Sequence, residues 1–325
     1  MEKIKKYIPG VIFVFIIGVM SNLVNEWMSP IVQLEALTVG IIVGMLVKNV
    51  FGVKEKFNSG VKFSLKKLLK VGIVFLGFKL NFSAIVHLGP KVLVTVIIFV
   101  FSVLALANVL GKVFKINTKL ATLIGVGSCI CGASAIVAMT PCIDAEEEDS
   151  VLAVSVISFL GAIGVLIYSG IAVVSSMTDV QYGIWAGISL QGVAHAIAAA
   201  FAREGSGEIG TFVKMARVLM LVPVSMILGV IFNRSNKEGK KASFPIYVLY
   251  FVIAGVIASL GFLPDYMISI FSKFSSWCIL MAMISMGLMV DFKNIKDKGM
   301  QVVLLGTILF GILSITTYFI IIKFF

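Results

Sequence analysis

Long apolar segments follow one another along almost the whole of this 325-residue chain. Hydrophobic residues make up 59% of it and charged residues only 13%, which is outside the usual balance of a soluble domain. A bilayer core takes about 20 apolar residues as a helix, and the segments lack the alternation of β-barrel strands. We therefore predict an all-α polytopic membrane protein. The apolar segments predict about eleven transmembrane helices, at 8–28, 34–52, 66–80, 91–114, 118–140, 150–175, 181–202, 209–232, 244–262, 266–290 and 300–323.

The distribution of basic residues predicts the orientation of the chain in the membrane. With the N-terminus in the cytoplasm, 20 of the 27 Lys and Arg residues fall on cytoplasmic segments. This asymmetry predicts a multi-pass cell-membrane protein with a cytoplasmic N-terminus, and it accounts for the net charge of +11 without a nucleic-acid partner. The turn near Asp179 gives no information on the orientation, because it is predicted to be cytoplasmic but carries no Lys or Arg. No cleavable signal peptide is expected, because the first apolar run is long and lacks a small-residue cleavage site.

A stretch rich in glycine and serine lies inside the predicted span 118–140. Gly127 and Gly132 allow a non-helical backbone, while Ser128 and Ser134 offer hydroxyl groups to a ligand. An interrupted backbone inside a bilayer needs protein or water to satisfy its polar groups. The stretch therefore predicts a discontinuous helix that lines a ligand site, with a seam of small residues between packed helices as the alternative.

A second stretch of small residues contains Gln191 and His195. These residues are four apart, so on a helix both side chains would project from one face and could bind substrate or relay a proton. A buried histidine that is satisfied by a neighbouring carbonyl is the alternative.

Three basic residues fall within predicted spans, namely Lys214, Arg217 and Lys273. A charge at membrane depth faces a cavity or a partner, or else extends to the headgroup region. The cavity-facing position is favoured most for Arg217.

The cysteines and the acidic residues predict less. Cys129 and Cys131 are poorly spaced for a metal pair or a disulfide, so packing is the expected role. The acidic run at 144–149 is expected to be a solvated loop outside the cell. No catalytic, metal-binding or cofactor-binding residue is predicted, and no cofactor is expected.

One local motif occurs twice, at the ends of the third and tenth predicted spans. The two copies are Gly77-x4-Phe82-x2-Ile85-x3-Gly89 and Gly287-x4-Phe292-x2-Ile295-x3-Gly299. The third and tenth spans are an odd number of crossings apart, so the two copies would point in opposite directions across the membrane. This predicts an inverted-topology repeat, typical of secondary transporters, within a single transmembrane domain over 1–325 with approximate halves 1–175 and 176–325. The register of the repeat stays open, because a five-plus-five division does not pair these two spans.

These segments resemble the hallmark segments of the sulfate exporter family of YeiH-like bacterial inner-membrane proteins. The resemblance rests on Gly125–Pro141 followed by Ala145-Glu146, on Gly187–Ala200 and on Lys214–Pro223, and it extends over nearly the whole chain. The family is itself distantly similar to the cation/proton antiporter and bile-acid symporter clan. Inverted repeats are therefore implied here as well.

The chain departs from the family pattern at two places. Where the family carries a His and, four residues later, a Gln, this chain has Gln191 and then His195. Thr140 stands where an acidic residue often precedes the proline.

The combined pattern predicts a secondary active transporter for a small anion such as sulfate or an organic sulfonate. It would work by alternating access, with a proton or sodium ion as the coupling ion and a homodimer as one possible assembly, and it is not expected to be an enzyme. The predicted substrate-binding residues are Gly127, Ser128, Cys129, Gly132, Ala133, Ser134, Gln191, His195, Lys214 and Arg217.

Two alternatives stay open. One is a cation/proton antiporter-like transporter, although few membrane-embedded acids are available. The other is a membrane redox protein or enzyme that uses Cys129, Cys131 or His195. No Gly-x4-Gly-Lys-Ser/Thr loop occurs in the sequence, which excludes a transporter driven by that kind of ATP site.

Overall fold

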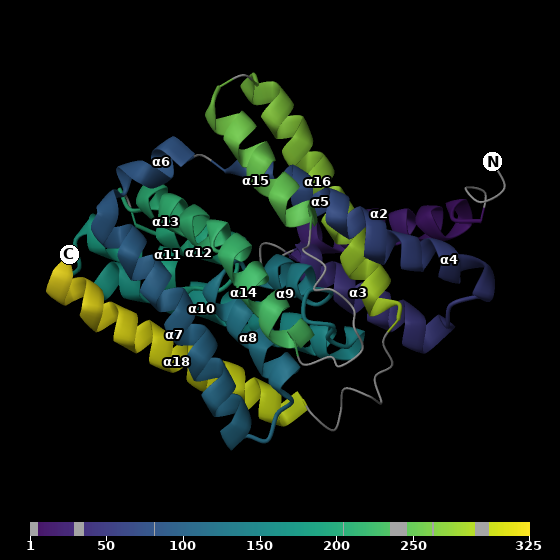
Figure 1. The fold of residues 1–325 in the computed structure, drawn as a ribbon, viewed down its shortest axis with the longest axis horizontal. Helices are drawn as coiled ribbons and strands as arrows, with labels where there is room; N and C mark the ends of the chain where they lie inside the picture. The colour runs from purple at the N-terminus through teal and green to yellow at the C-terminus, as the bar shows by residue number, and fades with distance from the viewer. Residues whose placement is uncertain are drawn as a thin grey trace. The chain divides into compact units, whose positions relative to one another are not determined.

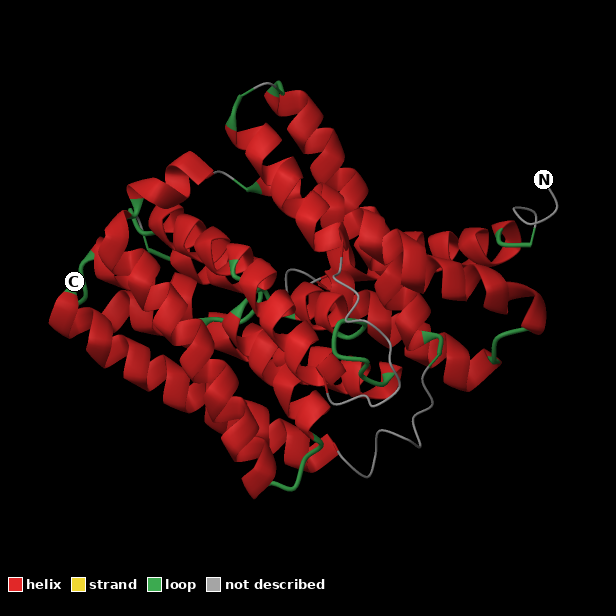
Figure 2. Ribbon diagram, in the orientation of Figure 1, coloured by secondary structure: helices red, strands yellow, loops and turns green. Residues whose placement is uncertain are grey.

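The computed structural model describes residues 6–28, 36–80, 82–203, 205–234, 246–261, 263–289 and 299–325. Every regular element in these residues is helical (Figure 2). Six helical stretches are long and apolar enough to cross a membrane: Ile8–Trp27, Gly89–Val113, Glu147–Val174, Gly207–Phe232, Asp265–Gly287 and Gly299–Phe324. The chain is therefore a polytopic helical membrane protein. Lys3, Lys5, the lysines between 237 and 241 and those between 293 and 298, which are among the basic residues counted above, lie outside the described residues, as do Phe292 and Ile295 of the repeated motif.

The helices form two compact units that interleave along the sequence. Unit 1 contains α2 (Ile8–Met28), α3 (Ala36–Phe51), α4 (Glu55–Phe63), η1 (Ser64–Leu68), α5 (Leu69–Leu76), η2 (Gly77–Lys79), α15 (Ile246–Ser259) and α16 (Asp265–Gly287). Unit 2 contains α6 (Phe82–His87), α7 (Gly89–Val113), α8 (Thr118–Cys129), α9 (Ala133–Met139), most of α10 (Glu147–Val174), α11 (Asp179–Ser189), α12 (Val193–Ala200), α13 (Gly207–Leu219), α14 (Leu221–Arg234) and α18 (Gly299–Phe324) (Figure 1). The predicted halves that meet near residue 175 stay a prediction.

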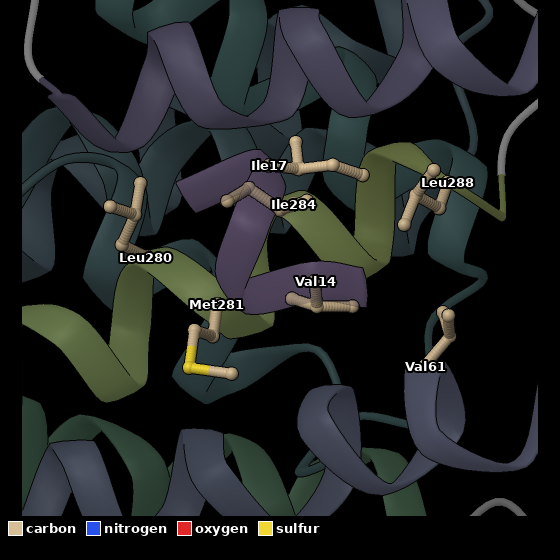
Figure 3. Packing of buried hydrophobic residues seen from close by; sticks show 7 residues of the cluster. All are labelled: Val14, Ile17, Val61, Leu280, Met281, Ile284 and Leu288. Atoms are coloured by element: carbon tan, nitrogen blue, oxygen red, sulfur yellow. The ribbon is translucent and has the colours of Figure 1, made fainter. Parts of the chain in front are cut away.

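Unit 1 is built around α16, which packs against α2, α3 and α5. Figure 3 shows its apolar core, in which the side chains of α16 meet those of α2 and α4. The cluster consists of Val14, Ile17, Val61, Leu280, Met281, Ile284 and Leu288. Close van der Waals packing of these side chains fixes how the helices of unit 1 fit together, since lipid is as apolar as the side chains themselves.

In unit 2, α8 and α9 form a helical hairpin, called here the first hairpin (residues 118–144). The Lys119 ammonium, at the start of α8, donates to the main-chain carbonyl of Asp144 and lies 3.8 Å from its carboxylate. Because α8 alone is about 18 Å long, this contact requires α9 to bring the chain back to the end where α8 began. At the turn Gly132 has φ +77°, a conformation that glycine adopts without the strain of a Cβ atom.

The second hairpin (residues 179–203) is formed in the same way by α11 and α12. Arg203 Nε, beyond the end of α12, donates to Asp179 Oδ1 at the start of α11 over 2.7 Å. Nearer to the turn, the Tyr182 hydroxyl of α11 lies 3.0 Å from the Ala199 carbonyl of α12. Its turn, at residues 190–192, has extended backbone on both sides of Gln191.

These hairpins correct two predictions. The interruption near Gly132 is confirmed, but 118–140 and 181–202 do not cross the membrane as single helices, because each segment turns back on itself. An apolar segment of 20 residues satisfies a length criterion equally well as one span or as two short arms, so composition cannot separate the two cases. The prediction that Gln191 and His195 share a helix face is also wrong, since Gln191 lies in the turn and α12 begins at Val193.

Candidate functional site

The tips of the two hairpins touch each other inside unit 2. A Cβ atom on Gly132 would lie 3.0 Å from the Cα atom of Gly192, so the two turns meet backbone to backbone. Four helix ends converge there: the C-terminal ends of α8 and α11 and the N-terminal ends of α9 and α12. Converging backbone ends leave several carbonyl and N–H groups without an intrahelical partner.

Arg217 of α13 binds the carbonyl ends of both hairpins at once. Its Nε donates to the Cys129 carbonyl over 2.8 Å and its Nη2 to the Ser128 carbonyl over 2.6 Å. From the second hairpin, Nη1 lies 3.0 Å from the Gly187 carbonyl and 2.5 Å from the Leu190 carbonyl. The side chain is fully buried. Four of the five guanidinium N–H groups are thus directed at main-chain oxygens, which fixes the two tips to one planar group.

Lys214, one helical turn before Arg217, binds the second hairpin. Its ammonium donates to the Leu190 carbonyl over 2.7 Å and also to the Gln191 carbonyl, and the side chain is fully buried. The C-terminal end of a helix carries a partial negative charge, so a cation there is stabilising. Lys214 and Arg217 therefore satisfy the carbonyl ends that the two turns leave open.

Two polar side chains at the tips have no hydrogen-bond partner among the described residues. They are the Ser128 hydroxyl of the first hairpin and the Gln191 amide of the second, whose Nε2 and Oε1 are both unpaired. Each side chain is about 1% exposed. Leaving a buried polar group unpaired costs about 1–3 kcal/mol, so both groups are available to a ligand at a site that is otherwise saturated.

His195, one turn into α12, lies against α10. A Cβ atom on Gly161 of α10 would come within 2.3 Å of His195 Nδ1, so the imidazole occupies the space that a side chain at position 161 would need. α10 also approaches the last turn of α8, where Ile157 lies 3.1 Å from the corresponding Cβ position of Gly127. α10 thus runs beside both hairpins at the level of their tips.

An aromatic brace holds α11 against α10 and α18. Trp185 stacks on Tyr168 with ring centroids 3.9 Å apart, and its Nε1 donates to the Ser314 carbonyl over 2.9 Å. The Tyr168 hydroxyl lies 2.7 Å from Ser189 Oγ and 2.7 Å from Ser314 Oγ. These contacts fix the last turns of α11, just before the turn that carries Gln191.

All ten sequence-predicted site residues lie in unit 2 at or beside the two tips. The last turn of α8 supplies Gly127, Ser128 and Cys129; the turn and first residues of α9 supply Gly132, Ala133 and Ser134; the rest are Gln191, His195, Lys214 and Arg217. The thiol of Cys131 is 3.1 Å from the Ser134 hydroxyl. Lys273, by contrast, is exposed on α16 in unit 1.

Sequence reasoning missed the main-chain and packing partners of this cluster. The carbonyl groups that bind Arg217 carry no signal in the residue type, and neither does Phe99 of α7, whose ring centroid lies 5.3 Å from the guanidinium. Gly161 was missed as well, although a glycine inside an apolar helix often marks a close approach of a neighbouring group.

Fold and site together define a polytopic helical membrane protein in which two short helical hairpins meet over two buried cations. Residues 9–306 match the family model described as Conserved hypothetical protein 698. The chain therefore belongs to that family, which is the YeiH/UPF0324 family, and the resemblance stated above is confirmed.

Relatives of similar length support this assignment. The UPF0324 membrane protein SA0329 of Staphylococcus aureus (strain N315) is 33% identical over 305 residues, covering 92% of this chain and 91% of that protein. A UPF0324 membrane protein of Bacillus anthracis is 35% identical over 289 residues, 87% of this chain and 85% of that protein. The UPF0324 membrane protein OB3406 of Oceanobacillus iheyensis is 34% identical over 284 residues, 84% of each chain.

Proposed function

We propose that this protein is a secondary active transporter of a small anion such as sulfate or an organic sulfonate, and that it is not an enzyme. The observation that carries the proposal is the pair of fully buried cations, Lys214 and Arg217, at the meeting point of two helix turns. Asp149 is the only acidic side chain that is buried in the described part of the chain, and it belongs to unit 1. The described part of unit 2 therefore contains no buried carboxylate.

The charge balance at the tips favours an anion. Each helix end is equivalent to about half an elementary charge, so the negative ends of α8 and α11 are offset by the positive ends of α9 and α12, and the dipoles leave the two positive charges in place. A buried charge that is not balanced is unfavourable, and a bound anion relieves it. Ser128, Gln191 and His195 would contact the anion, together with the residues of the turn at Gly132. Arg217 and Lys214 would position the turns and supply the field.

The length of α10 supports an arrangement in which the hairpins enter from opposite faces of the membrane. This helix of 28 residues, about 42 Å long, leads from the base of the first hairpin to that of the second. The arms α8 and α11 are about 18 and 16 Å long, and their sum is close to the thickness of a bilayer core of about 30 Å. The tips would then meet near mid-depth, where secondary transporters commonly bind their substrates.

An internal repeat at a spacing of 60 residues also supports this arrangement. Gly127 and Gly132 of the first hairpin correspond to Gly187 and Gly192 of the second. The repeat includes the hairpin bases, where Lys119 pairs with Asp144 in the first hairpin. In the second, Asp179 pairs with Arg203, so the order of the charges is reversed. In both hairpins the ion pair joins the two ends of the segment at its base.

We infer nine crossing segments and two re-entrant hairpins, with a cytoplasmic N-terminus. In this topology the turn near Asp179 lies outside the cell, which explains why it carries no Lys or Arg. The acidic run at 144–149 becomes cytoplasmic rather than external. The hairpins, each with the helix that follows it, form an inverted repeat, and alternating access would expose the tips to one face at a time.

The two alternative functions make different demands on the site. A cation/proton antiporter would use a membrane-embedded carboxylate, and the described part of unit 2 has no buried one. A redox protein would depend on Cys129 and Cys131, neither of which is in a disulfide, so that replacing the pair with alanine would abolish its activity. A transporter of the kind proposed needs no thiol chemistry, so that variant should still take up anions, with a changed affinity at most.

Flux of labelled anions into proteoliposomes tests the proposal. Purified protein should accumulate sulfate or a simple alkanesulfonate when a proton or sodium gradient is applied. The double variant Ser128→Ala/Gln191→Ala should lose most of this uptake, whereas Ser64→Ala, which removes another buried and unpaired hydroxyl but in unit 1, should retain it. Absence of uptake for every small anion under both gradients would refute the proposed function.

A further inference from the structure

Gln191 is held in place by its main chain while its side chain stays unpaired. Lys214 binds the carbonyl of Gln191 and that of the preceding Leu190. The next residue, Gly192, lies against Gly132 of the other hairpin. The position of the residue is therefore set by its main chain, and the amide has no hydrogen bond among the described residues to lose when a ligand binds.

The amide of Gln191 presents both kinds of hydrogen-bonding group. Nε2 carries two N–H donors and Oε1 is an acceptor, and neither atom has a partner among the described residues. An anion without a hydrogen-bond donor, such as sulfate, can satisfy Nε2 but leaves Oε1 unpaired. A ligand that satisfies both atoms must carry a donor of its own as well as anionic oxygens.

The Ser128 hydroxyl adds a second unpaired group from the opposite hairpin. Its main-chain carbonyl and that of Leu190 are bound by the same guanidinium, over 2.6 and 2.5 Å. Ser128 and Gln191, the residue after Leu190, therefore each offer a neutral donor to an anionic headgroup. The nearby cations also select the ligand's own donor, because an ammonium group would be repelled by Lys214 and Arg217 whereas a hydroxyl group would not.

Resting on the proposed function, we propose that the tip site recognises a small organic anion that carries a hydroxyl group, with the anionic headgroup on the side of Ser128 and Arg217 and the hydroxyl donating to Gln191 Oε1. A sulfonate or a carboxylate meets this description equally well. Inorganic sulfate and unsubstituted alkanesulfonates would bind more weakly.

The inference is tested with pairs of ligands of equal charge. Ethanesulfonate is compared with 2-hydroxyethanesulfonate, and propionate with 2-hydroxypropionate, by calorimetric titration of the detergent-purified full chain. We expect the hydroxylated member of at least one pair to bind about tenfold more tightly, as one added hydrogen bond to a buried unpaired group would give. The zwitterion 2-aminoethanesulfonate should bind more weakly than its hydroxyl counterpart.

Matched variants assign the preference to Gln191. In Gln191→Leu, which keeps the side-chain volume but removes both polar atoms, the hydroxylated and plain ligands should bind within about twofold of each other. In Ser64→Ala the tenfold preference should persist. Equal affinity for both members of each pair in the parent protein overturns this inference but leaves the proposed function intact, and it does so without reference to any variant. Failure of every anion to bind would refute both this inference and the proposed function.

Discussion

At the scale of single residues, the arrangement depends on a guanidinium that binds four carbonyl groups from two separate segments. Arg217 can do this because its donors lie in one plane and point in different directions, whereas a lysine ammonium is a compact group with three donors. The same residue supplies a charge and joins the two hairpins. Its proposed roles in structure and in binding are therefore inseparable in a simple deletion.

Replacing Arg217 is expected to lower stability in proportion to the donors lost. Arg217→Met removes the guanidinium from four buried carbonyl groups, of which Leu190 keeps Lys214 as a donor, and we expect a loss on the order of 3 kcal/mol or more. Arg217→Lys retains the charge and some of the hydrogen bonds, so its stability should lie between that of Arg217→Met and that of the parent protein. Thermal unfolding in detergent measures the order of the three proteins. Lys273→Met, at an exposed position of α16, is the control and should unfold with the parent; equal effects at both positions would contradict the account.

Gly161 is expected to matter through His195. In Gly161→Ala the new Cβ would lie 2.3 Å from Nδ1, so the ring must move, at a cost of about 1–3 kcal/mol. In a His195→Ala background the same substitution should cost almost nothing, because the space is already vacant. Gly170→Ala on the same helix has no atom within 4 Å of the new Cβ, and it should be neutral or stabilising by up to about 1 kcal/mol. A cost for Gly161→Ala that is the same in both backgrounds would show that His195 is not the group in contact.

At the scale of elements, the sequence predicted where the helices lie, but it did not predict that two of the segments turn back as hairpins. The apolar segments located α2, α7, α10, α16 and α18 to within a few residues, because a lipid-exposed helix requires a continuous apolar run. The hairpin arms have the same composition but half the length. What distinguishes them is the contact between their ends, such as that of Asp179 with Arg203, and a single sequence does not display such a contact.

The sequence selected residues that lie together at the tips, although it did not predict the hairpins that bring them together. Glycine and serine at residues 127–134 and polar residues at 191–217 are unusual at membrane depth, and this alone identified them. Their roles were less predictable. The partners of Arg217 are main-chain carbonyl groups, and which ones it binds depends on how α8 and α11 end.

The second hairpin is expected to depend on Tyr182. Its hydroxyl lies 2.9 Å from the Tyr168 carbonyl of α10 and 3.0 Å from the Ala199 carbonyl of α12, so it joins both arms to the neighbouring helix. Tyr182→Phe should cost about 1 kcal/mol, since one buried hydrogen bond is removed with little change in volume. Tyr266→Phe, at a side chain 66% exposed on α16, should cost nothing measurable. Thermal unfolding of the two variants side by side provides the comparison.

At the scale of the whole molecule, the account differs from a chain of eleven simple spans in where two loops lie. With two re-entrant hairpins, the bases at Asp144 and Asp179 fall on opposite faces, inside and outside respectively. With eleven crossings their positions are exchanged. The overall excess of basic residues on the cytoplasmic side is compatible with both, because Lys119 and Arg234 are cytoplasmic in each.

Side-specific thiol labelling of these two loops is the most direct test of the central claim, that two hairpins enter unit 2 from opposite faces and meet at the cation pair. The four native cysteines are buried, so a cysteine introduced at an exposed base residue reports its own location. In intact cells a membrane-impermeant maleimide should label Asp179→Cys, and should label Asp144→Cys only after the membrane is opened. Labelling of Asp144→Cys in intact cells, with Asp179→Cys protected until the membrane is opened, would contradict the account.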